Sequence, residues 1–110
     1  MDARTERLAE NESLFRSVNE LIEAAATRAV VDDHVFEFLC ECADSECMVL
    51  LPLNVHEYER VRAEPSQFLV APGHGLPELE IVVARHDTYE VVRKLGEAAD
   101  YVAKRDPRSL

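Results

Sequence analysis

The sequence lacks several features that would place it in other classes of protein. No apolar run approaches the roughly 20 residues that a membrane-spanning helix needs, and the polar start, Met1 to Arg7, is not followed by the apolar segment of a signal peptide. With 3 Gly and 5 Pro in 110 residues, the composition is that of a folded protein and not of a disordered tail. We therefore expect a single soluble domain over residues 1–110, located in the cytoplasm and not bound to a membrane.

Basic residues are scarce as well, at 12 against 22 acidic ones, which gives a net charge of −10. Because proteins bind nucleic acid phosphates through clustered Lys and Arg, this balance argues against a nucleic acid partner. The sequence contains no H-E-x-x-H, no P-loop and no dinucleotide-binding glycine pattern. An acidic surface of this kind most often serves solubility, and less often a basic protein partner or the mimicry of a nucleic acid.

The cysteines are present in an unusual arrangement. All 3 cysteines of the chain stand between Cys40 and Cys47, with the spacing C-x-C-x4-C. Thiols this close together can bind one soft metal ion, and an odd count in a reducing compartment disfavours disulfides. The acidic neighbours Glu41, Asp44 and Glu46 raise the pKa of a thiol, so they disfavour a catalytic thiolate and favour a bound divalent cation.

A tetrahedral zinc ion needs a fourth ligand beside the three thiols. His74 is the first candidate, because it stands in Pro72-Gly73-His74-Gly75, where the glycines let the backbone approach another segment closely. The alternatives are His34, His56, a water molecule or a carboxylate, and His86 is expected to be a solvated side chain. The predicted ligands are Cys40, Cys42, Cys47 and His74.

The same ligand set leaves the identity of the metal open. Three cysteines and one histidine suit zinc, and they can also hold a two-iron cluster. Zinc is favoured, because a compact turn between two strands is the usual setting of a structural zinc and a small domain gains most from such a staple. A catalytic zinc is disfavoured, because three thiolates make an electron-rich centre that acidifies bound water weakly.

A long helix is predicted at residues 4–30, where Gly and Pro are absent and apolar residues recur at helical spacing. The apolar positions are Leu8, Phe15, Val18, Ile22, Ala25 and Ala29, with Leu14 and Leu21 beside them. Either this stripe packs on the domain's own sheet, or it forms the seam of a homodimer with Asn11 at a buried heptad position. Glu12, Arg16 and Glu20 lie four residues apart and are expected to form surface ion pairs.

Residues 35–95 predict a small, mostly antiparallel sheet, with the cysteine stretch as a zinc-clasped connection between its first two strands. The expected strands cover 35–39, 48–53, 67–71, 80–85 and 89–95. Asn54 and Glu57 form a capping-box pattern that begins a short helix over 55–64, and a second short helix is expected over 97–105. The predicted fold class is α+β.

The sequence resembles a family of small uncharacterised bacterial proteins that is common among actinobacteria. The resemblance covers nearly the whole chain and rests on Asn11-Glu12-x-Leu14-Phe15-Arg16-x-Val18-Asn19-Glu20, Cys40-Glu41-Cys42 with Cys47, Glu57-Tyr58-Glu59-x-Val61-Arg62, Phe68-x-Val70-x-Pro72-Gly73-His74 and Tyr89-x-Val91-Val92-x-Lys94. It groups the cysteines and His74 into one pattern and implies no substrate.

These observations favour a non-enzymatic zinc-binding module with a regulatory or protein-interaction role. Its partner would be another protein, or a second copy that pairs through the N-terminal helix. The alternative is a redox or metal sensor that uses the cysteine cluster. An enzyme is the least favoured class.

Overall fold

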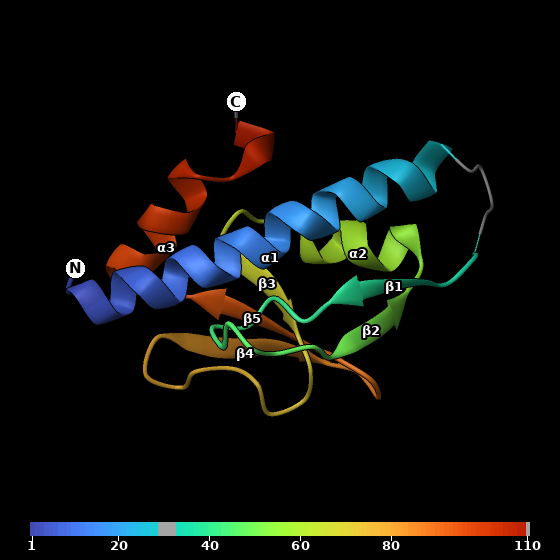
Figure 1. The fold of residues 1–110 in the computed structure, drawn as a ribbon. Helices are drawn as coiled ribbons and strands as arrows, with labels where there is room; N and C mark the ends of the chain where they lie inside the picture. Colours follow the sequence, from blue (N-terminus) through green and yellow to red (C-terminus); the bar gives the residue numbers. More distant parts are fainter. Residues whose placement is uncertain (29–32, 110) are drawn as a thin grey trace.

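The computed structural model describes residues 1–28 and 33–109. Helix α1 (Ala3–Arg28) runs along one side of the molecule, and the strands lie beneath it (Figure 1). The other elements are β1 (Phe36–Leu39), β2 (Leu50–Leu53), α2 (Val55–Val61), β3 (Gln67–Val70), β4 (Glu80–Arg85), β5 (Glu90–Lys94), α3 (Gly96–Lys104) and the 3-10 turn η1 (Pro107–Ser109). The predicted α+β class is confirmed, while the last predicted helical positions, 29 and 30, lie outside the described residues. None of the helices in this part of the chain is long and apolar enough to cross a membrane.

The strands form two small antiparallel sheets. In the first sheet β1 pairs with β2, which places Phe36 opposite Leu53 and Leu39 opposite Leu50. In the second sheet β5 lies between β3 and β4. The expected hairpins around the cysteine stretch and between β4 and β5 are therefore present, but the strands do not join into one sheet.

The buried face of α1 differs from the predicted apolar stripe. Val18 and Ala25, which packing on the domain's own sheet would bury, are exposed in the single chain. The buried residues of the helix are Ala9, Glu12, Arg16, Asn19 and Ala26. Asn11 was the residue expected at a buried heptad position of a helix pair. Its side-chain amide instead donates within the same chain to the carbonyl of Cys42 at 3.2 Å.

The buried polar side chains of α1 have partners in distant parts of the chain, although Nε of Arg16 has no hydrogen-bond partner among the described residues. Arg16 donates from Nη1 to the carbonyl of Pro65 at 2.5 Å and from Nη2 to that of Val102 at 2.8 Å. Its guanidinium also lies over the ring of Phe68, 4.3 Å from the centroid. A buried polar group with its partners in place avoids the desolvation penalty that an unpaired one would carry.

The expected surface ion pairs between Glu12, Arg16 and Glu20 are accordingly wrong. Glu12 is fully buried and lies 2.5 Å from Nζ of Lys94. Glu20 binds Arg62 at 2.6 Å and Arg108 at 2.7 Å instead of Arg16. These pairs join α1 to the end of α2, to β5 and to the C-terminal turn, so long-range polar contacts help to fix the helix beside the apolar packing of Ala9 and Ile22.

The apolar core lies between α1, α2 and the two sheets. Phe38 of β1 stacks on Tyr58 of α2, with the ring centroids 4.5 Å apart. The capping box of α2 forms as predicted, because Glu57 donates its backbone N–H to the side chain of Asn54 and accepts from the Asn54 N–H, both at 2.8 Å. This fixed helix start holds Tyr58 in the core, beneath the cysteine stretch.

Candidate metal centre

The structure brings the four predicted ligands together. Their ligand atoms all lie within 4.8 Å of one another. Nδ1 of His74 is 3.6 Å from Sγ of Cys40 and 3.7 Å from Sγ of Cys47. A tetrahedral ion with Zn–S bonds of about 2.3 Å and Zn–N bonds of about 2.0 Å separates sulfur and nitrogen ligands by about 3.6 Å. The donor types and these two spacings therefore fit one tetrahedral metal ion.

The other histidines lie outside this group. His34 contacts Phe36 edge to face, with the ring centroids 4.6 Å apart. His86 stacks on Tyr89 at 4.4 Å, and His56 is exposed on α2. His74 is thus the histidine that the fold presents to the thiols.

The C-x-C spacing follows from the alternation of side chains along an extended chain. Cys40 extends the pairing of β1 with β2, because its N–H donates to the carbonyl of Val49 at 3.1 Å. Cys40 and Cys42 then point to the same side, toward His74, and Glu41 between them points to the opposite side. The extended segment therefore presents two predicted ligands on one face and an acidic side chain on the opposite face.

Asp44 shapes the turn that returns the chain to Cys47. The carbonyl of Asp44 accepts from the N–H of Cys47 at 3.1 Å, and its carboxylate accepts from the N–H of Glu46 at 2.9 Å. This arrangement is typical of Asp in turns. It brings the third thiol back over the first two before β2 begins.

Backbone N–H groups surround the sulfurs. Ala71 donates to Sγ of Cys40 at 3.1 Å, and the nearby backbone N–H groups of Asp44 and Val49 lower the pKa of Cys42 and oppose the rise in the pKa of Cys47, respectively. Such bonds orient metal-bound thiolates and offset part of their negative charge.

The three thiols differ in pKa, and Cys42 is the one that ionises most readily. A hydrogen bond from Cys40 is the main cause that lowers the pKa of Cys42 to about 5. The pKa of Cys40 is raised, chiefly by the same hydrogen bond with Cys42 and then by burial, and burial raises the pKa of Cys47. A divalent cation at this position would favour the thiolate form of all three.

The loop that carries His74 is held close to β5 and the cysteine stretch. The N–H of His74 donates to the carbonyl of Ala71 at 2.9 Å, and Gly73 has a φ of +82°, which favours glycine. A Cβ at Gly75 would lie 3.2 Å from Cγ1 of Val92. The two glycines therefore permit the tight turn and the close approach that were expected of this loop.

Sequence reasoning missed the structural role of Glu41, whose charge was expected to act on the thiols. Its carboxylate is fully buried and accepts hydrogen bonds from Nδ2 of Asn19 at 2.8 Å, the hydroxyl of Tyr58 at 2.7 Å and the N–H of Leu69 at 2.9 Å. Burial raises its pKa, and these donors oppose the shift. The alternation in C-x-C was the available signal, because it directs the middle residue away from the ligands and into the core.

No protein-family model, curated protein or solved structure matches this chain. In the absence of a match, we describe the protein by its fold and its candidate site. It is a small α+β protein in which three cysteines and one histidine form a group that can hold a metal ion.

Proposed function

We propose that the protein is a non-enzymatic zinc-binding module in which a structural zinc ion joins the cysteine turn to the loop that carries His74. The observation that carries this proposal is the convergence of four ligand atoms to within 4.8 Å. Four protein ligands complete a tetrahedral zinc and leave no open position for a water or a substrate. The assignment of the metal to a structural role follows from this closed ligand set.

The spacing also favours one ion over a two-iron cluster. A two-iron cluster distributes its protein ligands over two metal atoms, so ligand atoms on different irons must lie farther apart than those around one ion. Here the largest separation is 4.8 Å. Thiolate and imidazole ligands in a tetrahedral arrangement suit zinc.

An ion at this place would stabilise the domain by linking segments far apart in the chain. Cys47 and His74 are 27 residues apart in sequence, and the intervening chain includes α2 and β3. Because the unfolded chain has no preformed site, the free energy of metal binding contributes to the free energy of folding.

A stripe on the outside of α1, which we call the outer stripe, supports an interaction role. Leu14 is 59 % exposed, Val18 36 % and Leu21 71 %, and Ala25 continues the stripe at alternating steps of four and three residues. That spacing suits the seam of a helix pair. We propose that the partner is a second copy of the chain.

The outer stripe is self-complementary in an antiparallel pair. Around a two-fold axis between positions 19 and 20, Leu14 would face Ala25 of the second copy and Val18 would face its Leu21. The exposed Glu10 would then lie beside the exposed Arg28 of the second copy. The opposite charges favour this orientation.

Metal analysis of the purified protein tests the zinc assignment. We expect one zinc per chain, no visible absorption, and loss of cooperative thermal unfolding when a chelator removes the metal. A C42S variant expressed and purified in parallel should retain far less zinc. A coloured protein with iron, or a protein whose zinc content and stability are the same in wild type and C42S, would overturn the proposal.

One observation favours a redox sensor as a second candidate. Cys47 is only partly buried and His74 is exposed, so a small oxidant can reach the site. Two thiolates would give two electrons to hydrogen peroxide, which takes up two protons and leaves as two waters, while the thiolates form a disulfide and release the metal. Release of zinc at micromolar peroxide, reversed by a thiol reductant, would favour the sensor, and retention at millimolar peroxide would exclude it.

Membership in the small bacterial family remains a proposal. Its support is that the residues quoted for the resemblance in α1 include Glu12, Arg16 and Asn19, which are the polar residues that this helix buries. A set of homologous sequences in which these three positions vary while the cysteines do not would speak against it.

A further inference from the structure

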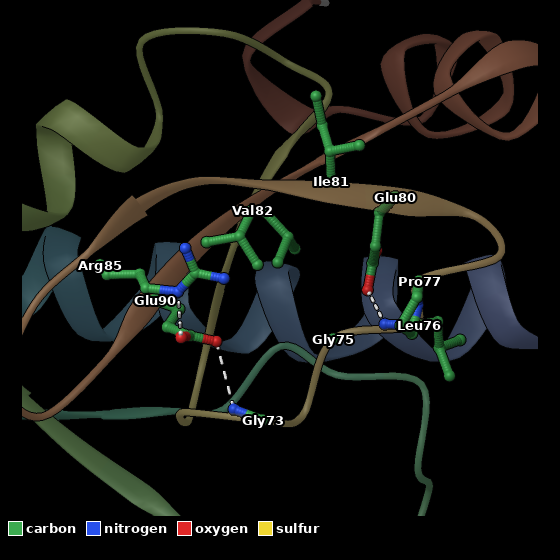
Figure 2. A pocket seen from close by; sticks show the side chains of 10 residues that line it. Gly73, Gly75, Leu76, Pro77, Glu80, Ile81, Val82, Arg85 and Glu90 are labelled. Atoms are coloured by element: carbon green, nitrogen blue, oxygen red, sulfur yellow. Dashed lines mark hydrogen bonds and ion pairs between the residues drawn. The ribbon is translucent and has the colours of Figure 1, made fainter.

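A pocket lies beside the loop that carries His74, between that loop and the strands β4 and β5 (Figure 2). Its volume is about 490 Å³, which is in the range of pockets that bind small molecules. Gly73 and Gly75 line it, and the four predicted metal ligands do not. It is therefore a site separate from the metal centre.

The pocket has a mainly apolar wall. Leu76, Pro77, Val82 and Val92 line it. The side chain of Ile81 points to the other face of β4, whereas Val82 points to the face of the pocket (Figure 2). Leu76, Pro77 and Val82 are at least partly exposed, whereas Val92 is fully buried beneath them, so an apolar molecule of a few carbon atoms would remove the first three from water.

The carboxylates in the pocket already have partners. Glu90 accepts from the N–H of Gly73 with Oε1 and from Nε of Arg85 with Oε2, both at 3.2 Å. Glu80 accepts from the N–H of Leu76 at 2.6 Å and lies 3.1 Å from Nζ of Lys94. Neither acid is therefore a free cation site, and both fix the shape of the pocket.

Arg85 is the polar group in the pocket with unused donors. Its Nε is bound to Glu90, while its two terminal nitrogens have no partner among the described residues. Figure 2 shows Arg85 and Glu90 side by side at one end of the pocket and Glu80 at the other. The Glu90 contact holds the near end of the guanidinium and leaves its outer donors available to a planar anion.

We propose that this pocket binds a small carboxylate with an apolar body, such as a medium-chain or aryl-substituted acid. The carboxylate accepts from the terminal nitrogens of Arg85, and the body packs against Leu76, Pro77 and Val82. A neutral compound of the same shape makes only the apolar contacts. The inference goes beyond the metal-binding function and does not depend on the oligomeric state.

Titration of the zinc-loaded, ¹⁵N-labelled protein with octanoate, followed by amide chemical shifts, tests this site. We expect saturable shifts at Gly73, Gly75, Leu76 and Val82. Octanamide, which has the same chain without the charge, should bind at least about fivefold more weakly. Shifts spread over the surface without saturation, or equal affinity of octanoate and octanamide, would overturn the proposal.

Two variants separate recognition in the pocket from the effect of net charge. R85Q should weaken octanoate binding about tenfold and leave octanamide binding unchanged, with unchanged zinc content. R93Q is the matched control, because Arg93 lies on β5 opposite Ile81, does not line the pocket and carries the same charge. Equal losses in R85Q and R93Q would overturn the assignment of Arg85, whatever the state of the metal centre.

Discussion

Glu41 and Leu69 are joined by two hydrogen bonds in opposite directions. The N–H of Glu41 donates to the carbonyl of Leu69 at 2.6 Å, and the N–H of Leu69 donates to the carboxylate of Glu41 at 2.9 Å. They tie the residue between two predicted ligands to β3, the strand that leads into the loop of His74. The approach of the cysteine stretch to His74 is therefore set partly by contacts that need no metal.

Replacement of Glu41 by Gln is expected to destabilise the protein. Oε2 of Glu41 accepts from both Asn19 and Tyr58, and the amide of Gln can present an acceptor to only one side of its head group. An unpaired buried donor costs about 1–3 kcal/mol, so we expect the free energy of unfolding to fall by about 2–3 kcal/mol in chemical denaturation with zinc present.

Tyr58→Phe is the comparison variant for E41Q and is expected to lose less stability. It removes one hydrogen bond and retains the stacking on Phe38, so we expect a loss of about 1 kcal/mol. An E41Q protein that is as stable as Y58F would contradict the role assigned to the carboxylate.

Replacement of His74 by Ala is expected to weaken metal binding. Loss of a direct ligand should lower zinc affinity by at least about 100-fold, the upper end of the effect of outer-shell partners. Competition with a chromophoric chelator measures this change. His86→Ala is the control, because His86 is also an exposed loop histidine but lies outside the ligand group; equal affinities of the two variants would exclude His74 as a ligand.

Replacement of Leu21 by Glu is expected to abolish pairing through the outer stripe. Leu21 is 71 % exposed, so the free energy of unfolding of the single chain should change by less than about 0.5 kcal/mol. Light scattering should show the molar mass of two chains for the wild type and of one chain for L21E.

Leu95→Glu is the control for the outer stripe, because Leu95 is 45 % exposed at the start of α3 and not on α1. We expect L95E to retain the mass of two chains. A wild-type protein with the mass of one chain at all concentrations would show that the outer stripe is not a dimer interface.

Glu12 is expected to make stability depend on pH. Burial is the main cause that raises its pKa to about 8, with Lys94 opposing and Glu80 adding to the shift. Because the pKa is higher in the folded state than its ordinary value of 4.5, the stabilising contribution of Glu12 is fully present below the unfolded-state pKa. It is lost as the pH rises through about 8.

Glu12→Gln removes this dependence, because glutamine does not titrate. We therefore expect the wild type to lose stability relative to E12Q as the pH rises. The free energies of unfolding of both proteins, measured in zinc-saturated protein from pH 5 to pH 9, give this difference. Zinc binding also varies with pH, but it affects both proteins alike and cancels in the difference. Parallel stability curves would contradict the assignment.

The elements that depend on local pattern were predictable from the sequence. Clustered thiols and a glycine-flanked histidine predicted the metal-binding group, and the capping pattern of Asn54 and Glu57 predicted the start of α2. These features depend on residue type and short spacing, which are present in the sequence itself.

The buried face of α1 was not predictable in the same way. Arg16 is buried because it binds the carbonyl of Val102, which lies 86 residues away in the chain. Apolar periodicity does not detect such partners, so it could not distinguish the exposed Val18 from the residues of the helix that pack inside the domain. The division of the strands into two sheets is also a long-range property, because it depends on which strands from distant parts of the chain pair with one another.

The loop from Gly73 to Pro77 faces two sites at once, with His74 directed to the thiols and its neighbours directed to the pocket. Any molecule that binds the pocket more tightly when His74 is held must, by thermodynamic reciprocity, tighten zinc binding by the same factor. If the loop behaves as one rigid unit, octanoate should slow the transfer of zinc to a chelator, and zinc should increase the affinity for octanoate. The zinc affinity of this 110-residue chain would then rise with the concentration of a small molecule that does not contact the metal.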